Sequence, residues 1–352
     1  MNVATFLLPL FISLWSLVGG YDEAELVFVG DAMQHVAQRD AAHRPDGTYD
    51  FSQCFEQVKP IVESADYAVV NLETPVGPGP YSGYPCFNAP PSYVDALSDA
   101  GFDLFLTANN HTLDRGPRGL RATIAELDRR GLDHVGTYSD DSARTAALPL
   151  LRTVENIRFG FLNYTYGTNG INPRDGVVVD YIDRDLIADD VERTRSAGAE
   201  IIAVCIHWGD EYHLLPNAAQ RSLAEYLESL GVDMIIGGHP HVIQPMELRA
   251  NRYLPGKNVF LVYSLGNFIS NMKKPDTRGG AMARVLVRRL DNGVPTIVEA
   301  GYRLLFTVPG TSPDNNFHVV EVRYADDRRA AAFAESARRI FDIHNIAVDE
   351  IR

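Results

Sequence analysis

The chain has 352 residues, of which 45% are hydrophobic and 22% are charged, and its formal net charge is −14. This composition is that of a globular protein and excludes a disordered chain. The negative charge argues against non-specific binding of nucleic acid, which requires an excess of Lys and Arg. A polyanionic substrate would therefore have to be held by local positive charge, such as bound metal ions.

The N-terminal segment, residues 1–20, contains no charged residue. Its apolar run at 6–12 continues to Leu17-Val18-Gly19-Gly20, where small residues could form a cleavage site. This pattern is typical of a secretory signal peptide. The alternative is a single membrane anchor, although an apolar stretch of about 17 residues that contains Pro9 is marginal for spanning a bilayer. Either way we expect an exported protein that is periplasmic, extracellular or membrane-anchored.

Apolar runs rich in Val, Ile and Phe alternate with segments of helical periodicity from Glu25 to about Phe268. Fully apolar strands between helices indicate a sheet that is buried on both faces. We expect Ser92 to cap one helix and Gly131 to end another. In chain order the predicted elements are strand 26–29, helix 55–64, strand 67–70, helix 92–100, strand 104–106, helix 120–130, strand 159–162, helix 186–197, strand 201–206, helix 217–230 and strand 232–236.

The pattern changes after Phe268. Asp291-Asn292-Gly293 lies between two apolar runs and predicts a β-hairpin over 285–298. A further strand is expected at 302–307 and a charged helix at 326–341. We therefore divide the chain into residues 1–20, a principal domain at 25–272, and a C-terminal part at 273–352 that completes or extends this domain.

The three cysteines have different surroundings in the sequence. Cys205 lies in an apolar run and is expected to be an inert core thiol. Cys54 and Cys86 could form a disulfide in an oxidising compartment, but the sequence does not show whether they are close in space.

Potential metal ligands follow several of the apolar runs. Ligands of α/β proteins bind beyond the carboxyl ends of the strands, and imidazole nitrogen suits manganese, zinc or iron. Each residue alone has a structural explanation, as a helix cap, a solvated loop residue or a core histidine. Their recurrence at five such ends predicts a centre with two metal ions, in which a carboxylate bridges the cations and water is activated. The residues concerned are Asp31, Asn71, Glu73, Asn109, Asn110, His111, His207, His239 and His241.

The order of these motifs resembles that of the CapA-type capsule-synthesis proteins, which belong to the calcineurin-like metallophosphatase superfamily. The resemblance extends over about Glu25 to Phe268. It rests on the runs Asn71-Leu72-Glu73-Thr74-Pro75, Ala108-Asn109-Asn110-His111-Thr112-Leu113-Asp114-Arg115-Gly116, His239-Pro240-His241-Val242-Ile243-Gln244-Pro245-Met246-Glu247 and Tyr263-Ser264-Leu265-Gly266-Asn267-Phe268.

The resemblance implies a layered α/β/β/α sandwich with a metal site at the carboxyl ends of the strands. It also implies ligands for two divalent ions, manganese, zinc or iron. Asp31 and His241 would bind one ion, and Glu73 would bridge the two. Asn110, His207 and His239 would bind the other ion. His111 would be the catalytic imidazole, which is not a ligand but transfers a proton.

Two positions depart from the wider superfamily. The usual Asp-x-His motif is Asp31-Ala32-Met33 here, and Glu73 replaces the usual bridging Asp. Because Met33 is a poor ligand for a hard cation, the first metal is expected to bind weakly. His35 is the nearest alternative imidazole, although we expect it to be a loop residue.

A second group of residues is expected around these ligands or in contact with substrate. Asp114 and Arg115 are expected to hold the loop of His111. Glu211 could contact substrate or be a solvated loop residue, and the loop 81–85 could line the rim of the site or pack on the sheet. The whole group is Asn71, Asn109, Asp114, Arg115, Glu211 and Asn267.

The predicted function is that of an exported, metal-dependent, hydrolase-like protein. It would act in synthesis, modification or export of a capsule or cell-envelope polymer such as poly-γ-glutamate. The alternative is a non-catalytic, polymer-binding subunit of a capsule export complex. The expected partners are the envelope polymer or a small anionic substrate, and capsule-synthesis membrane proteins, but no nucleic acid.

Overall fold

The computed structural model describes residues 22–351. The predicted signal peptide or anchor at residues 1–20 lies outside the described residues. Within 22–351, no helix is both long and apolar enough to cross a membrane.

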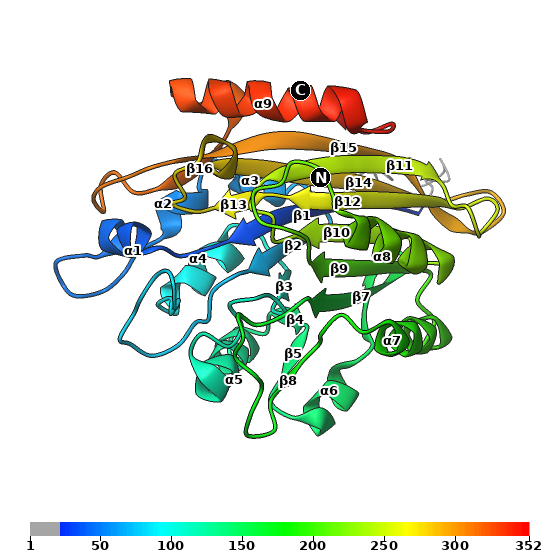
Figure 1. The fold of residues 1–352 in the computed structure, drawn as a ribbon, viewed down its shortest axis with the longest axis horizontal. Helices are drawn as coiled ribbons and strands as arrows, with labels where there is room; N and C mark the ends of the chain where they lie inside the picture. Colours follow the sequence, from blue (N-terminus) through cyan, green and yellow to red (C-terminus); the bar gives the residue numbers. More distant parts are fainter. Residues whose placement is uncertain (1–21, 352) are drawn as a thin grey trace, which may run out of the picture.

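Two β-sheets form the centre of the molecule (Figure 1). The first sheet has the strand order β16-β15-β14-β1-β2-β3-β4, with β13 beside β1 and β17 beside β15. Its strands are β1 (Glu23–Ala32), β2 (Tyr67–Leu72), β3 (Leu104–Leu106), β4 (Asp133–Val135), β13 (Asn267–Ile269), β14 (Gly279–Arg289), β15 (Pro295–Val308), β16 (His318–Glu321) and β17 (Asp349–Glu350).

The second sheet has the order β11-β12-β10-β9-β7-β6. Its strands are β6 (Leu150–Val154), β7 (Ile157–Thr165), β9 (Ile201–His207), β10 (Met234–Gly238), β11 (Ile243–Ala250) and β12 (Asn258–Leu265). A short separate ladder joins β5 (Thr137–Tyr138) and β8 (Val178–Val179).

Successive side chains of β1 point alternately into two hydrophobic cores, one on each face of the first sheet. Leu26 and Phe28 point into a core shared with the second sheet, where Tyr67 of β2 stacks on Phe161 of β7 at 5.2 Å between ring centroids. Val27 points to the opposite face, into a separate core under the helices that follow β1 and β2. Because successive side chains of a strand face opposite sides, the first sheet is buried on both faces, as the sequence predicts.

Helices cover the outer faces of both sheets (Figure 1). Those of the first half are α1 (Val36–Ala42), α2 (Ser52–Phe55), α3 (Lys59–Val62), α4 (Ser92–Asp99), α5 (Gly116–Asp128) and α6 (Asp141–Ala147). The second half contributes α7 (Arg184–Ser196), α8 (Ala218–Ser229), α9 (Arg328–His344) and the 3-10 turns η1 (Pro275–Thr277) and η2 (Val322–Tyr324). The predicted layered α/β/β/α sandwich is confirmed.

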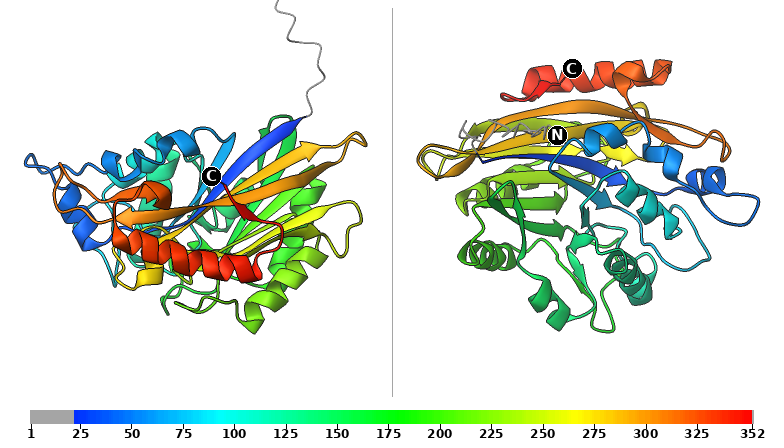
Figure 2. Two further views of the ribbon diagram at one scale, coloured as in Figure 1. Left: turned by 90° about the horizontal axis from the view of Figure 1, so that it is seen from above. Right: turned by 180° about the vertical axis from the view of Figure 1, so that it is seen from behind.

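The C-terminal part continues the first sheet. β14 pairs antiparallel with β1, and the turn at 291–293 connects β14 to β15, so the predicted hairpin is confirmed. Helix α9 then lies across the strands, where Phe341 packs against Tyr302 of β15 at 4.5 Å between ring centroids (Figure 2).

Several predicted boundaries are wrong. The helix expected at 55–64 is two short helices, α2 and α3. Ser92 is the first residue of α4 and not its cap, which is Pro91. Helix α5 begins at Gly116 because Pro117 is well placed in a first helical turn. The strand expected at 302–307 is the second half of β15, which runs without interruption past a register shift opposite Leu286 and Val287.

Candidate metal centre

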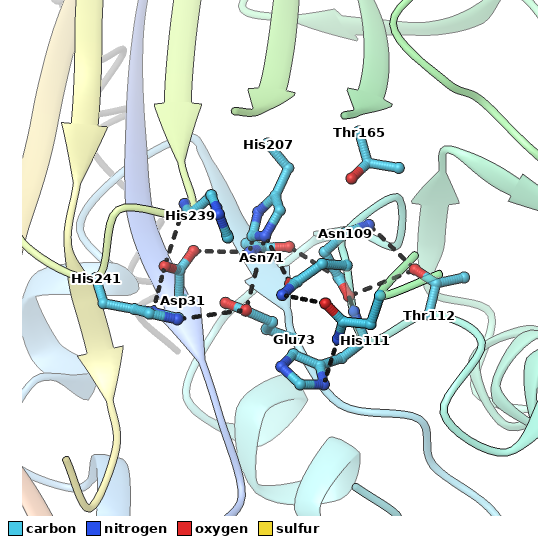
Figure 3. Close-up of polar contacts among 12 residues, drawn as sticks. Asp31, Asn71, Glu73, Asn109, His111, Thr112, Thr165, His207, His239 and His241 are labelled. Atoms are coloured by element: carbon cyan, nitrogen blue, oxygen red, sulfur yellow. Dashed lines mark hydrogen bonds and ion pairs between the residues drawn. The ribbon is translucent and has the colours of Figure 1, made fainter. Parts of the chain in front are cut away.

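The carboxyl ends of strands from both sheets meet at one site. Asp31 lies near the end of β1, Glu73 directly follows β2, and His207 is the last residue of β9. His239 and His241 follow β10. β1 runs parallel to β2, and β9 runs parallel to β10, so these ends share one edge of the sandwich. The side chains of all five residues point toward one another in Figure 3.

Glu73 is the most unusual residue of this group. Its side chain is fully buried, and neither carboxylate oxygen has a hydrogen-bond partner among the described residues. Burial, and next the charge of Asp31, raise the pKa of Glu73 well above its usual value. A buried carboxylate without a hydrogen-bond partner is strongly destabilising unless a proton or a cation neutralises it.

Asp31 is buried beside Glu73 but is well paired. Its Oδ1 accepts a hydrogen bond from Asn71 Nδ2 at 2.8 Å, and its Oδ2 lies 3.3 Å from His241 Nδ1. Burial alone would raise the pKa of Asp31. The hydrogen bond with His241, the charges of His207 and His241, and the bond from Asn71 together lower it to about 2.

The three imidazoles approach these carboxylates from the second sheet. His207 Nε2 lies 3.6 Å from Glu73 Oε1 and 2.9 Å from Asn110 Oδ1. His241 Nε2 lies 3.9 Å from Glu73 Oε1. Nδ1 of His239 is buried without a hydrogen-bond partner. Burial is the first cause that lowers the pKa of His207, and burial also lowers that of His239, to about 4.

The backbone that presents two of these imidazoles is strained. His239 has φ of 95° and His241 has φ of 58°, values that non-glycine residues rarely adopt. Each such conformation costs about 1–3 kcal/mol and persists where the surrounding structure fixes it, often at functional sites. The strain is consistent with a loop shaped to present both imidazoles to Glu73.

The donor set suits divalent transition metals. One donor atom each from Glu73, His239 and His241 lie within 4.8 Å of one another, and so do those of Asp31, Glu73 and His207. Glu73 belongs to both groups, as a bridging carboxylate would. A cation would also provide the partner that the buried oxygens of Glu73 lack. The residues therefore fit the expected metal group, whereas the assignment of each ligand to one of two ions stays a prediction.

His111 lies beside this cluster in the loop that follows β3 (Figure 3). Its Nδ1 donates a hydrogen bond to Asp114 Oδ2 at 2.8 Å, and Phe87 packs edge-on against its ring at 4.6 Å. Because Nδ1 carries the hydrogen, Nε2 is the atom left to exchange a proton. Arg115 does not hold this loop: it is exposed, and its side chain has no hydrogen bond or ion pair with another described residue.

Three asparagines connect the cluster to its surroundings. Asn71 bonds to Asp31, and Asn109 Nδ2 donates to Asn71 Oδ1 at 3.2 Å and to the carbonyl of Leu72 at 2.9 Å. Asn267 Oδ1 lies 3.0 Å from His241 Nδ1. Such outer contacts orient metal ligands, which is the role expected for these residues.

Met33, which replaces the usual histidine of the superfamily motif, and His35, the alternative imidazole, lie in different surroundings. Met33 is buried. His35 caps α1, packs edge-on against Phe87 at 5.3 Å, and accepts a hydrogen bond from the backbone of Asn271. Burial lowers the pKa of His35 to about 4.

The remaining predicted residues lie at the periphery. Glu211 and the loop residue Tyr84 are exposed. Cys54 and Cys86 are free thiols, and Cys205 is buried as expected. Cys86 Sγ lies 2.7 Å from the carbonyl of Asp114, next to the His111 loop.

Two residues of the site escaped the sequence analysis. Asn169 Oδ1 accepts a hydrogen bond from Asn110 at 3.2 Å, and its amide nitrogen lies 3.5 Å from His111 Nδ1. The ring of Tyr166 lies 4.5 Å from that of His239. Both follow β7, which runs parallel to β9. Polar residues that follow a predicted apolar strand are site candidates, and Tyr166 and Asn169 follow the predicted strand at 159–162.

A family model described as "Bacterial capsule synthesis protein PGA_cap" matches residues 25–272. The chain belongs to this family. The PGA_cap chain is 26% identical to the capsule biosynthesis protein CapA of Bacillus anthracis, over 77% of this chain and 65% of the relative. It is 29% identical to the PGA biosynthesis protein CapA of Bacillus subtilis (strain 168), over 68% of this chain and 62% of the relative. The aligned region thus spans less than two thirds of either relative.

A solved structure of the NAD nucleotidase NadN of Haemophilus influenzae is similar in fold to the PGA_cap chain. The TM-score is 0.52 at 13% identity, with coverage of 94% of this chain and 64% of that chain. At this identity the likeness concerns the fold alone. The family and the fold class expected from the sequence motifs are both confirmed.

Proposed function

We propose that the PGA_cap chain is an exported, metal-dependent hydrolase that acts on a capsule or cell-envelope polymer such as poly-γ-glutamate. The observation that carries this proposal is the buried carboxylate of Glu73, which has no hydrogen-bond partner within residues 22–351 while three imidazoles surround it. Family membership and the names of the two Bacillus relatives support the polymer as the substrate class.

The site offers a separate group for each requirement of hydrolysis. Two divalent ions held by Asp31, Glu73, Asn110, His207, His239 and His241 would activate water and stabilise negative charge on the attacked group. His111 is positioned to give a proton from Nε2 to the leaving amine or alkoxide. Asp114 holds His111 in the required tautomer through Nδ1. The bond cleaved is an amide of the polymer backbone or a phosphoester.

The first test is the metal content of protein purified without chelator, measured by mass spectrometry. We expect near-stoichiometric manganese, zinc or iron, and its loss in the double variant His207→Ala, His239→Ala. A content of one ion per chain would indicate that the position beside Met33 binds weakly. No metal after reconstitution would contradict the hydrolase mechanism.

The second test measures cleavage of poly-γ-glutamate and of a chromogenic phosphodiester by the metal-loaded protein. His111→Ala should retain its metal and lose turnover by about 100-fold or more. If the metal-loaded wild type binds the polymer but cleaves neither substrate, the chain is the non-catalytic subunit and the hydrolase proposal fails.

A further inference from the structure

The segment 270–278, between β13 and β14, is tied directly to the metal centre. Asn267, which contacts His241 through Oδ1, also donates from Nδ2 to the carbonyl of Thr277 at 2.9 Å and to Ser270 Oγ at 3.2 Å. At the other side of the segment, the backbone of Asn271 donates to His35 Nδ1 at 3.2 Å. The position of this segment is therefore fixed relative to the ligand His241.

The segment carries three cations and one acidic residue, Asp276, and none of the three cations is in an ion pair with a described carboxylate. Lys273, Lys274 and Arg278 form no ion pair with any carboxylate of residues 22–351. Lys273 Nζ instead bonds to Asn271 Oδ1 at 2.6 Å, and Arg278 Nε bonds to the carbonyl of Lys273 at 3.3 Å. This gathering is unexpected in a chain of net charge −14, in which most arginines are paired with carboxylates.

The same cations repel one another. The pKa of Lys273 is lowered first by desolvation and then by the charges of Arg278 and Arg329. The pKa of Arg278 is lowered first by burial and then by the charge of Arg329 in the first turn of α9, whereas the charge of Asp327, the ion-pair partner of Arg329, acts in the opposite direction. A cluster of like charges is unfavourable by itself and is relieved by a bound anion.

An aromatic ring connects these cations to the metal ligands. Lys274 Nζ lies 3.4 Å from the centroid of the Tyr212 ring, and this ring lies 6.3 Å from that of His241. Tyr212 has φ of 68°, and its backbone nitrogen donates to the carbonyl of Pro240 at 2.8 Å. The loop that presents His239 and His241 therefore also fixes Tyr212.

We propose that Lys273, Lys274 and Arg278, here called the cationic rim, form with Tyr212 a subsite that binds the side-chain carboxylates of an acidic polyamide next to His241. This inference rests on the proposed function, for which it names the residues that select the substrate. Separate cations along one segment suit carboxylates that are spaced along a chain, each held by a point charge. The ring of Tyr212 offers an apolar surface to the methylene groups between them.

Glu211 allows a second substitution whose expected effect on binding is opposite to that of the lysine substitutions. It is exposed and precedes Tyr212, and after burial its carboxylate raises the pKa of Tyr212 further, first as a hydrogen-bond partner and then through its charge. A carboxylate bound at Tyr212 would be repelled by this charge. Removal of the charge at Glu211 should therefore strengthen binding of an acidic polymer, whereas removal of the rim lysines should weaken it.

The experiment measures binding of a γ-linked glutamate oligomer to the full, metal-loaded chain by fluorescence anisotropy at low and high salt, with His111→Ala in every protein so that the oligomer is not cleaved during the measurement. Lys273→Ala, Lys274→Ala should raise Kd about tenfold at low salt and should reduce its salt dependence. Glu211→Gln should lower Kd. The control Lys59→Ala, Arg339→Ala removes the same charge from α3 and α9, and we expect less than a twofold change.

Two further probes decide the substrate class, namely polyphosphate and a neutral oligomer of γ-linked isoglutamine, in which each pendant carboxylate is replaced by an amide. If the subsite is correct, the glutamate oligomer should bind most tightly of the three probes. Its Kd should also be the only one that changes strongly when the rim lysines are removed. Unchanged Kd in the lysine variant, or an equal loss in the control, would overturn the proposal. Tighter, rim-dependent binding of polyphosphate would overturn the choice of a polycarboxylate.

The outcome is separable from that of the hydrolase proposal. Cleavage is measured separately, on the metal-loaded protein with an intact His111. Rim-dependent binding without any cleavage would retain the subsite and refute the hydrolase. Cleavage of poly-γ-glutamate with kcat and KM unaffected by the rim variants would retain the hydrolase and refute the subsite.

Discussion

Asp31 and Glu73 are both fully buried at the same site, yet their pKa values are shifted in opposite directions. Asp31 has hydrogen bonds with Asn71 and His241 and a pKa of about 2, whereas Glu73 has no hydrogen-bond partner among the described residues and a raised pKa. In the absence of metal, the protein therefore stabilises the ionised form of Asp31 but not that of Glu73. The difference makes Glu73 the residue on which metal binding should have its largest effect.

Glu73→Gln should have opposite effects on the metal-free and the metal-loaded protein. A carboxyl group whose pKa is raised on folding destabilises the folded state as pH rises above its unfolded value of about 4.5. At pH 7 without metal, the variant should therefore be more stable than the wild type by about 1–3 kcal/mol. Saturating metal should stabilise the wild type and leave the variant nearly unchanged.

Chemical denaturation with chelator and with manganese measures both effects. Glu63→Gln, an exposed substitution on the C-terminal side of α3, is the control and should change neither. A metal-free variant less stable than the metal-free wild type would contradict the assignment of Glu73 as an unpaired buried carboxylate.

Asn267→Ala should weaken metal binding without removing a ligand. Asn267 accepts from His241 Nδ1 and also holds the segment of the cationic rim through Thr277. Loss of an outer contact to a ligating histidine reduces metal affinity about 10- to 100-fold. Competition with a chromogenic chelator measures this affinity. The matched control is Asn258→Ala, which removes a contact to the carbonyl of Ile297. An equal loss in both variants would point to a general loss of stability.

Asp114→Asn tests the orientation of His111. The variant keeps the size of the side chain but no longer fixes the hydrogen of His111 on Nδ1, so turnover should fall about 10- to 100-fold while the metal is retained. Arg115→Ala, one residue further along the same loop, should leave turnover unchanged because its side chain has no hydrogen bond to the site. The pH profile of turnover in the wild type and Asp114→Asn separates loss of orientation from loss of folding. A variant with normal turnover would remove Asp114 from the mechanism.

Much of the site is encoded locally and could be predicted. Each ligand candidate lies near the end of an apolar strand or within a few residues after it, and parallel strands bring their carboxyl ends to one edge. Asp31 and Glu73 follow this rule on β1 and β2, and His207 follows it on β9. The alternation of apolar strands and helices likewise predicts the doubly covered sheets.

Other features depend on tertiary contacts that have no local pattern. Strands β11 and β12 were not predicted. The pairing of β13 with β1, which places Asn267 beside Asp31, joins segments distant along the chain. The rim cations lie within six residues of the sequence, but only the fold places Lys274 over Tyr212. Hydrophobic periodicity carries no information about such contacts between loops.

A buried ion-pair cluster far from the metal centre predicts acid sensitivity. Glu228 of α8 is fully buried and accepts hydrogen bonds from Arg249 at 2.7 and 2.9 Å and from Arg252 at 2.6 and 3.0 Å. Burial alone would raise the pKa of Glu228, but the bonds from Arg249 and Arg252 lower it to about 2. Its contribution to stability is therefore complete above the unfolded pKa of about 4.5 and is lost as pH falls toward 2.

Glu228→Gln should remove this part of the pH dependence. Between pH 6 and pH 2 the free energy of unfolding should fall less in the variant than in the wild type, by up to about 3 kcal/mol. At pH 7 the variant should be less stable, because Arg249 and Arg252 lose their carboxylate partner. Denaturant unfolding at a series of pH values measures both effects, and the exposed substitution Glu335→Gln on α9 is the control. Parallel pH curves for wild type and Glu228→Gln would show that the carboxylate of Glu228 titrates alike in the folded and unfolded states, so that its ion pairs contribute no pH-dependent stability.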